Sequence, residues 1–233
     1  MEVHELHPWN VSPEEARQIQ RDLRQRLSLV DTIAIPDIHH VAGVDNGYVR
    51  RGASTTAFAA VIVLTFPGHE VVETQVASCP VEFPYVPGLL SFREAPAMLA
   101  AFRQVESEPD VVLVDAHGYA HPRRLGAASH LGLLLGRPTI GCAKSRLVGH
   151  YEEPGPNHGD RAPLVDRGEQ VGAVVRTRVG RGPLFVSPGN GVSISTAVEI
   201  ALACCRDNAF MPEPTRLADR LVAQHTKAAR AQS

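Results

Sequence analysis

Three segments in the first third of the chain concentrate apolar residues in the way that β-strands do. Residues 41–49 (VAGVDNGYV), 56–66 (TAFAAVIVLTF) and 70–78 (EVVETQVAS) are separated by short connections rich in Gly, Arg and Pro. Short connections between successive strands favour antiparallel pairing. The pattern therefore predicts a three-stranded antiparallel meander.

A helix precedes this meander. Ser12 is followed by a proline, and Glu15 lies three residues after Ser12, which is the spacing of a capping box at a helix start. Ile19 and Leu23 then recur on one helical face. We expect this helix to run from residue 13 to about residue 29.

The middle of the chain has the pattern of a strand, a helix and a second strand. Residues 111–115 (VVLVD) are a short apolar run that ends on an aspartate, and residues 139–145 (TIGCAKS) form a similar run after a helical stretch near 123–135. A further helix over roughly 95–107 comes before them. Strands joined through a helix favour parallel pairing with a right-handed crossover.

The last third continues with strands and a helix. Residues 152–169 (EEPGPNHGDRAPLVDRGE) are rich in Gly, Pro and charge and predict an exposed loop. Two strand-like runs follow at 171–179 (VGAVVRTRV) and 183–189 (PLFVSPG), and residues 196–207 (TAVEIALACCRD) have helical spacing. From residue 213 the chain is polar, so we expect a frayed tail.

The order of these elements predicts the fold class. No internal repeat or long linker divides the 233 residues, so we expect a single domain over 1–233 whose ends, 1–10 and 213–233, are flexible. The order β-β-β-α-β-α-β gives an α/β fold with a mixed sheet flanked by helices. It matches the ribonuclease H-like arrangement, in which three antiparallel strands are followed by parallel ones and the first strand lies beside the fourth.

Composition narrows the class of protein further. Hydrophobic residues make up 44% of the chain, and a net charge of −2 gives no global reason to expect nucleic acid. Cys79, Cys142, Cys204 and Cys205 show no C-x-x-C spacing and indicate free thiols. Because the sequence has neither a secretory signal nor an 18-residue apolar run, we expect a cytoplasmic monomer that contacts no membrane.

Two of the predicted strands carry a single acid at the end of an apolar run: Asp45 follows VAGV and Asp115 follows VVLV. If the first strand lies beside the fourth, the two carboxylates meet across a strand spacing of about 4.8 Å. Two buried anions repel each other, and Mg²⁺ or Mn²⁺ relieves that repulsion. The alternative is that each aspartate caps a strand end, but their occurrence on neighbouring strands favours a metal site.

Glu94, in the stretch LLSFREAP, permits two interpretations. Ser91 and Glu94 have the spacing of a capping box, which would make Glu94 a helix cap. Pro96 would then lie at the fifth helical position, where its missing N–H breaks the ladder. A helix that begins nearer Glu94 accommodates the proline and frees the carboxylate, which would be a third acid for a site able to hold two metals.

Four motifs together resemble the endonuclease V family, and they occur in the family's order: VAGVDNGY, FPYVPGLLSFREAP, VDAHGYAHPRRLGAASHLG and IGCAKSRLVG. The resemblance covers roughly residues 10–207. It implies a Mg²⁺-dependent endonuclease, with Mn²⁺ as a substitute, that acts in DNA repair. Such an enzyme recognises hypoxanthine in DNA containing deoxyinosine and cuts the second phosphodiester bond 3′ to the lesion.

The resemblance also implies which residues carry the chemistry. Asp45, Glu94 and Asp115 match the metal-binding carboxylates of the family. His121 and Lys144 match residues near the scissile phosphate, and a lysine at a strand end can pair with phosphate as a point charge.

Recognition of the base is assigned to other residues of the same motifs. Tyr85 matches the wedge that fills the gap left by the displaced base, and its flanking prolines make it a stiff plug. Gly88, Leu90 and Gly126 match parts of the pocket that receives the base, where glycines let the backbone approach a purine edge closely.

The segment after Asp115 is rich in basic residues. We expect His121, Arg123, Arg124 and His130 to form a local basic patch that contacts the nucleic acid, although the chain as a whole is nearly neutral.

One position departs from the family pattern. After Ser-Pro-Gly the family usually has histidine, and some members aspartate, near the metal, whereas this chain has Asn190 in SPGNGVS. An amide oxygen binds metal weakly and cannot act as a base. Asn190 is thus a candidate metal-proximal residue, or a residue that adopts positive φ in a turn. The alternatives to a DNA repair enzyme are an inosine-specific endoribonuclease and, because of Asn190, a weakly active or non-cutting inosine binder.

Overall fold

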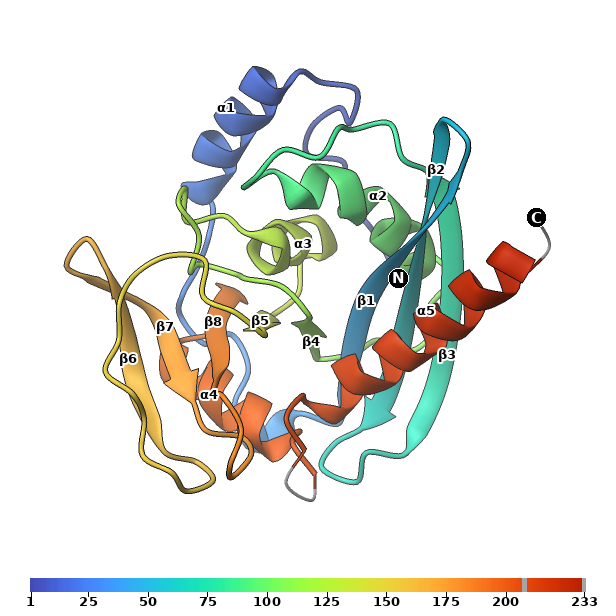
Figure 1. Cartoon of the computed structure of the whole chain (residues 1–233). Helices are drawn as coiled ribbons and strands as arrows, with labels where there is room; N and C mark the ends of the chain where they lie inside the picture. Colours follow the sequence, from blue (N-terminus) through green and yellow to red (C-terminus); the bar gives the residue numbers. More distant parts are fainter. Residues whose placement is uncertain (207–208, 232–233) are drawn as a thin grey trace.

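The computed structural model describes residues 1–206 and 209–231, and its strands form one sheet (Figure 1). The strands are β1 (His40–Arg51), β2 (Ser54–Thr65), β3 (Val71–Pro80), β4 (Val111–Val114), β5 (Thr139–Ala143), β6 (Arg161–Asp166), β7 (Glu169–Val175) and β8 (Leu184–Asn190).

The strands lie side by side in the order β3-β2-β1-β4-β5-β8-β7-β6. β1, β2 and β3 form the predicted antiparallel meander, and β4 and β5 are parallel to β1. β1 is beside β4, as expected, because the helical connection carries the chain from β3, at one edge of the meander, across to β1 at the other. This mixed sheet is the ribonuclease H-like arrangement that the order of elements predicts.

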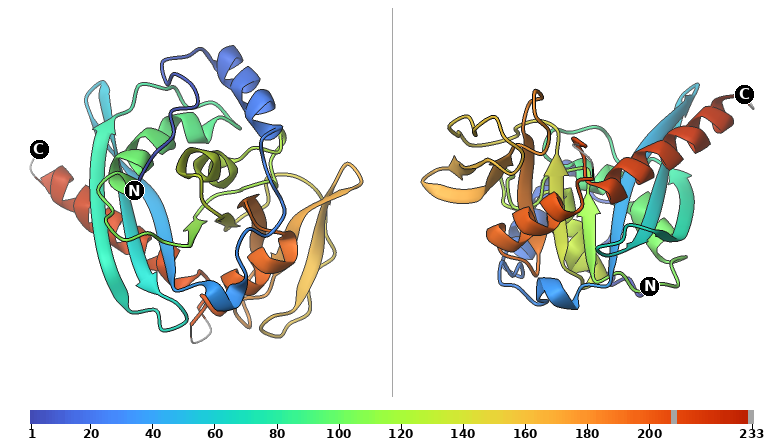
Figure 2. Two further views of the ribbon diagram at one scale, coloured as in Figure 1. Left: turned by 180° about the vertical axis from the view of Figure 1, so that it is seen from behind. Right: turned by 90° about the horizontal axis from the view of Figure 1, so that it is seen from below.

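The helices cover both faces of the sheet (Figure 2). One face packs against α2 and α3, with α1 beyond them, and the other packs against α4 and α5. Their bounds are α1 (Pro13–Arg24), α2 (Leu90–Phe102), α3 (Ala127–Leu135), α4 (Ile194–Ala203) and α5 (Glu213–Ala231), with a short 3₁₀ helix, η1 (Ile35–Asp37), before β1.

The first helix begins where the sequence predicts. The backbone N–H of Glu15 donates to Ser12 Oγ at 3.3 Å, and the Ser12 N–H donates to Glu15 Oε2 at 2.7 Å, which completes the capping box. The helix ends at Arg24, five residues earlier than expected.

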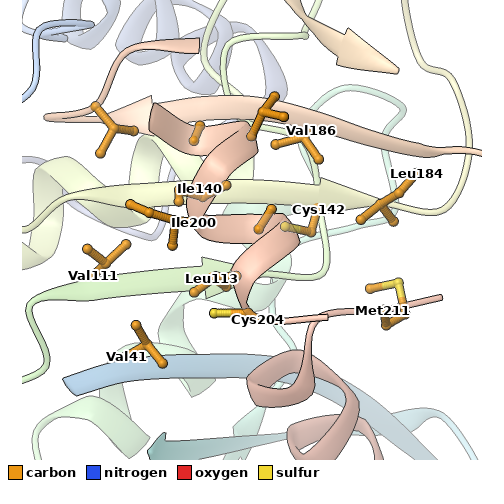
Figure 3. Close-up of a cluster of buried hydrophobic side chains, with 14 of the residues drawn as sticks. Val41, Val111, Leu113, Ile140, Cys142, Leu184, Val186, Ile200, Cys204 and Met211 are labelled. Atoms are coloured by element: carbon orange, nitrogen blue, oxygen red, sulfur yellow. The ribbon is translucent and has the colours of Figure 1, made fainter. Parts of the chain in front are cut away.

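The core on the α4 face is a continuous layer of aliphatic side chains (Figure 3). Leu113 on β4, Ile140 on β5 and Val186 on β8 are fully buried, and Ile200 of α4 packs against them. Burial of both faces explains why β4 and β5 are near-continuous apolar runs rather than alternating ones.

The stretch 152–169, expected as a loop, contains a strand. β6 (Arg161–Asp166) pairs with β7 at the edge of the sheet. Ala162 and Leu164 point inward and are buried, whereas Pro163 lies on the exposed side. An edge strand tolerates proline and needs only one apolar face, so the charges and the proline of this stretch conceal it.

The C-terminal segment from residue 213, expected as a frayed tail, is also different. α5 is a helix of 19 residues that packs along β1 and β2 (Figure 1). Ala218 and Val222, which belong to α5, are buried on the face that packs against the sheet. A side chain at Gly43 of β1 would place Cβ 2.1 Å from the carbonyl carbon of Pro214, and one at Gly47 would meet Thr226 at 2.9 Å. These glycines leave the space that α5 fills.

The first ten residues are likewise held against the domain rather than free of it. The amino group of Met1 donates to the carbonyl of Val105 at 2.5 Å, and the His4 N–H donates to Leu134 at 2.7 Å. Val3, Leu6 and other apolar side chains of this segment pack on the core beneath α2 and α3. No helix among the described residues is long and apolar enough to cross a membrane.

The close seat of α5 on β1 gives a test of the fold. We expect Gly43→Ala to lower the melting temperature, because its Cβ would overlap the Pro214 backbone and overpacking of this kind costs about 1–3 kcal/mol. For a chain of this size, each kcal/mol corresponds to roughly 2–4 °C. The control is Gly182→Ala, since a Cβ there meets nothing within 4 Å. Equal melting temperatures for the two variants would contradict this seat for α5.

Candidate functional site

Two carboxylates stand side by side where β1 passes the end of β4. Val44 pairs with Val114 in the parallel register, and the next residue on each strand is an aspartate, Asp45 and Asp115. Both side chains are partly buried. The structure thus brings together the two acids that the apolar runs place on neighbouring strands.

Burial and proximity make this pair electrostatically unfavourable. Burial, and after it the charge of Asp115, raise the pKa of Asp45 to about 7. The pKa of Asp115 is also raised, chiefly by burial. Both carboxyls therefore resist ionisation unless a cation is present, as expected for like charges in a poorly solvated place.

Glu94 approaches the pair from α2, on the other face of the sheet. α2 begins at Leu90 without a side-chain cap, so Glu94 is no capping residue, and Pro96 lies inside the helix. The hydroxyl of Tyr48 donates to Glu94 Oε1 at 3.0 Å. Burial raises the pKa of Glu94 to about 7, against the lowering effect of the Tyr48 hydrogen bond and with a further increase from Asp115. The carboxylate is thus free of the helix end and directed toward the aspartates.

A fourth acid, Asp219 on α5, faces the same place. Its charge raises the pKa of both Asp45 and Asp115. Asp219 is not among the residues predicted for the site, because it lies in the segment expected to fray. The signal was present: Leu217, Ala218, Leu221 and Val222 have the spacing of an amphipathic helix that would carry Asp219.

Lys144 provides the cation among these side chains. Its ammonium lies 2.5 Å from Asp115 Oδ2. Burial lowers the pKa of Lys144, but the hydrogen bond to Asp115 and the charges of Asp115, Asp45 and Asp219 outweigh that effect and raise it. One lysine thus faces three carboxylates, so the site keeps an excess of negative charge.

These residues fit a divalent cation. Within residues 1–206 and 209–231, no three His, Cys, Asp or Glu side chains already surround one point as metal ligands do. The donor set is nevertheless all oxygen, which Mg²⁺ and Mn²⁺ prefer, and Lys144 compensates only part of its charge. The buried Oδ1 of Asn46, next to Asp45, has no hydrogen-bond donor among the described residues. A cation bound by the carboxylates would offset their charge, whereas the Asn46 amide donates to the Glu94 carbonyl at 3.1 Å, on the α2 side of β1.

A pocket of about 430 Å³ opens directly beside the carboxylates. It contains every residue that the sequence analysis connects with the displaced base or the scissile phosphate. These are Tyr85, Gly88, Leu90, Gly126, His121 and Lys144, together with Asp115.

The glycines of the pocket are required by close backbone contacts. Gly88 has a φ of +79°, which favours glycine, and its carbonyl accepts hydrogen bonds from Gln20 (3.0 Å) and Arg123 (2.7 Å). A Cβ on Gly126 would lie 2.3 Å from the carbonyl oxygen of His117. Small residues therefore shape this wall of the pocket whatever it binds.

Tyr85 stands at the mouth of the pocket with 72% of its surface exposed. Nearby Leu90 is 39% exposed. Large apolar side chains at this level of exposure are available to a partner, and their place beside a cavity makes them candidates for contact with a bound base.

His121 differs from the cation expected near the phosphate. Only 3% of its surface is exposed, its Nε2 lies 3.1 Å from the Gly88 carbonyl, and its Nδ1 accepts from the Arg123 N–H at 3.2 Å. Burial, with the neighbouring charge of Arg123, lowers the pKa of His121 to about 3. The ring is therefore neutral and holds the Gly88 loop in place.

Of the residues predicted to form a basic patch, Arg123 is half-buried and lines a surface pocket with Arg21 and Arg24, whereas His130 and Arg124 are taken up inside the fold. His130 is completely buried, which lowers its pKa to about 3, and its Nε2 lies 2.7 Å from Nε2 of His7. Arg124 is 6% exposed and lies 2.8 Å from carboxylate oxygens of both Asp166 and Glu169. Burial disfavours charged imidazole and selects a paired guanidinium, so these residues support the loop from within.

Asn190 is not near the carboxylates. Asn190 ends β8 and pairs with Thr139 at the start of β5, whereas Asp115 follows the far end of β4, with β5 between the two strands. Its Oδ1 accepts from the Ser28 N–H at 3.1 Å. The positive φ of this turn belongs to Gly191, at +66°. Asn190 therefore connects the segment after α1 to β8, and neither proposed role applies to it.

Comparison with known proteins shows which family this chain resembles. A family model described as Endonuclease V matches residues 21–220. The endonuclease V of Trichormus variabilis is 49% identical over 221 residues, which are 95% of this chain and 98% of that protein.

Solved structures agree over the whole chain. The crystal structure of the Bacillus subtilis endonuclease V superposes with a TM-score of 0.96 at 31% identity and covers 100% of both chains. The Ciona intestinalis endonuclease V has a TM-score of 0.82 at 26% identity, covering 93% of this chain and 98% of that one. That protein was crystallised with a 24mer DNA containing an inosine followed by a ribo-adenosine.

The repulsion at the carboxylates predicts a pH-dependent gain in stability when one of them is removed. The folded-state pKa of Asp45, about 7, exceeds its ordinary value, so ionisation of Asp45 destabilises the metal-free fold fully above pH 7 and not at all near pH 4. We expect Asp45→Asn in EDTA to raise the melting temperature by about 2–4 °C at pH 8, as for roughly 1 kcal/mol, and much less at pH 5. Asp115→Asn should gain less, because it leaves Lys144 without its partner.

The control for this measurement is Asp37→Asn, which removes an exposed carboxylate of η1, before the start of β1. Its melting temperature should follow that of the wild type at both pH values. A gain for Asp45→Asn that is the same at pH 5 and pH 8 would contradict the repulsion.

Proposed function

Because the chain belongs to the endonuclease V family, we propose that it is a metal-dependent endonuclease that recognises deaminated adenine in DNA and cuts the second phosphodiester bond 3′ to the lesion, in DNA repair. One observation carries the proposal. Asp115 and its partner Lys144 lie at the cluster of acids and also line the neighbouring pocket. A base held in that pocket therefore has its own backbone close to the carboxylates.

The carboxylates would hold the metal. Asp45, Asp115 and Asp219, with Glu94 on the far side of Asp115, would bind Mg²⁺, or Mn²⁺ in its place. When bound, such a cation supplies an activated water and stabilises the leaving oxygen in displacement at phosphorus, which leaves 5′-phosphate and 3′-hydroxyl ends. Lys144, whose ammonium lies 2.5 Å from Asp115 Oδ2, would pair with a phosphate oxygen of the bound strand.

The pocket would take the base out of the stack. An enzyme cannot read a purine edge inside a duplex, so the nucleotide must turn outward. Gly88 and Gly126 let the backbone approach the base, and the neutral ring of His121 keeps the Gly88 loop rigid. Tyr85, exposed at the mouth, would occupy the vacated place in the duplex.

One observation keeps an RNA substrate as a second candidate. The DNA in the Ciona complex carries a ribo-adenosine directly after the inosine, so a 2′-hydroxyl at that position is compatible with binding to that relative. Matched ribo- and deoxyribo-inosine strands distinguish the two functions. The non-cutting alternative rested on Asn190, which lies away from the site.

The proposal is tested by nicking of a strand that contains a single inosine. We expect one cut in the presence of Mg²⁺ or Mn²⁺ and none in EDTA. A control strand in which adenine replaces hypoxanthine should not be cut. Asp45→Asn and Asp115→Asn should each lower the rate by about two orders of magnitude or more, since removal of one charged ligand from a shared site weakens metal binding strongly. Nicking by either variant at the wild-type rate would remove that residue from the site.

The wedge role of Tyr85 has a separate test. Because aromatic stacking on a base is worth about 1–3 kcal/mol, Tyr85→Ala should weaken binding of the inosine duplex roughly tenfold. The loss should be smaller on single strands, where no vacancy needs filling. Tyr85→Phe keeps the ring and serves as the control. An equal loss on damaged and undamaged duplexes would count against a wedge.

A further inference from the structure

A second and larger cavity adjoins the base pocket at Asp115 and Lys144. Its volume is about 680 Å³, and Asp115 and Lys144 line it as they line the base pocket. Asp219 also lines it. Asp115 and Lys144 therefore border two cavities, and the function proposed above uses only the base pocket.

The β7–β8 loop supplies two exposed arginines to this larger cavity, which is called the arginine groove below. Arg178 and Arg181 both line the cavity and are both exposed. A third exposed arginine, Arg206, follows α4 and lines the same cavity. Three guanidinium groups from two separate segments thus share one groove.

Two buried residues between β7 and Arg178 fix this loop. Arg176 is 9% exposed, contacts the carboxylate of Glu153 at 2.6 Å and donates to the carbonyl of Arg181. Thr177 is fully buried, and its hydroxyl donates to the carbonyl of Phe210 at 2.7 Å. The chain therefore presents Arg178 and Arg181 from an anchored loop, so their position costs little ordering entropy on binding.

The charges of the groove are uneven. Arg216 is paired with Glu213 at 2.5 Å, and Lys144 with Asp115 at 2.5 Å, so these four charges largely cancel. Among the described lining residues, this leaves Asp219 at the carboxylate end and the three exposed arginines beyond it. The groove is thus negative where a metal would bind and positive farther out.

Arg181 is also placed over an aromatic ring. Its guanidinium carbon lies 4.4 Å from the centre of the Phe210 ring, which lines the groove as well. A positive groove with an aromatic surface is the combination that proteins use to hold single-stranded nucleic acid through its phosphates and bases.

We propose that this groove binds the lesion-containing strand on the 3′ side of the cut, with Arg178 and Arg181 on its phosphates. The inference rests on the proposed function in one respect: the cut lies 3′ to the base held in the pocket. A strand that starts in the base pocket and passes the carboxylates then enters the arginine groove in the 5′ to 3′ direction. The direction of the strand follows from the order of the two cavities.

The test compares binding of the two cleavage products, neither of which contains a bond to cut. One probe is a DNA of about ten nucleotides with a 5′-phosphate, equivalent to the 3′ product. The other has the same length and ends in inosine and one further nucleotide, equivalent to the 5′ product. We expect Arg178→Ala/Arg181→Ala to bind the first about tenfold more weakly and the second as the wild type does, because only the first would lose two phosphate contacts.

Salt dependence measures the same contacts independently. Each phosphate contact to a single strand contributes about 0.7 to the slope of log K against log salt, so the double variant should lose about 1.4 for the 3′ product. Arg178→Lys/Arg181→Lys keeps both charges and should restore most of the affinity. The matched control is Arg103→Ala/Arg137→Ala, which removes two surface arginines that pair with Glu5 and Glu108 elsewhere on the molecule.

Each outcome decides one way. Unchanged binding of the 3′ product, an equal loss on both products, or a loss confined to the 5′ product would overturn the assignment of the groove. Failure of the proposed function is visible separately, as absence of nicking or as equal binding of 5′ products that carry inosine and adenosine. The groove is thus tested even if no strand is cut.

Discussion

The candidate site depends on the repulsion between carboxylates that are partly shielded from water. Asp45 and Asp115 are adjacent in the β1–β4 register, Asp219 faces both from α5, and Glu94 reaches Asp115 from the opposite face of the sheet. Burial alone would favour their neutral forms, and each neighbour adds to that effect. Lys144 offsets part of this repulsion, and the remainder destabilises the metal-free fold, which is the effect that the proposed cation would remove.

The neighbouring structure is adapted to deliver those acids. β1 carries Gly43 and Gly47 on either side of Asp45, and both leave room for the backbone and side chains of α5. Because these two glycines let α5 pack closely on β1, Asp219 of α5 lies near the aspartates. On the other face, Tyr48 of β1 orients Glu94 through its hydroxyl. A single strand therefore positions acids from both helical layers, and sheet register and site geometry cannot vary independently.

Much of this arrangement is readable from local pattern. The meander, the parallel pair β4–β5 and the adjacency of Asp45 and Asp115 follow from apolar runs and connection lengths, because these depend on strand propensity and chain reach. β6 and Asp219 were missed since an edge strand and a surface helix each bury one narrow face, which proline and charge conceal. Asn190 was misplaced because proximity across a sheet depends on register, and a β-strand of seven residues separates its ends by about 20 Å.

The basic residues show why composition predicts interaction surfaces poorly. Arg124 and Arg176 are buried and paired with carboxylates, and His121 and His130 are buried with lowered pKa values, so of the basic residues in the motif after Asp115 only Arg123 keeps a charge near the surface. Exposed Arg178 and Arg181 belong to a stretch that resembles ordinary strand and loop. With a net charge of −2, the whole protein cannot attract a polyanion over long distances, and charges more than about 8 Å apart are screened at physiological salt. Attraction must therefore come from guanidinium groups placed within contact distance of the strand, and burial rather than residue type decides which ones are available.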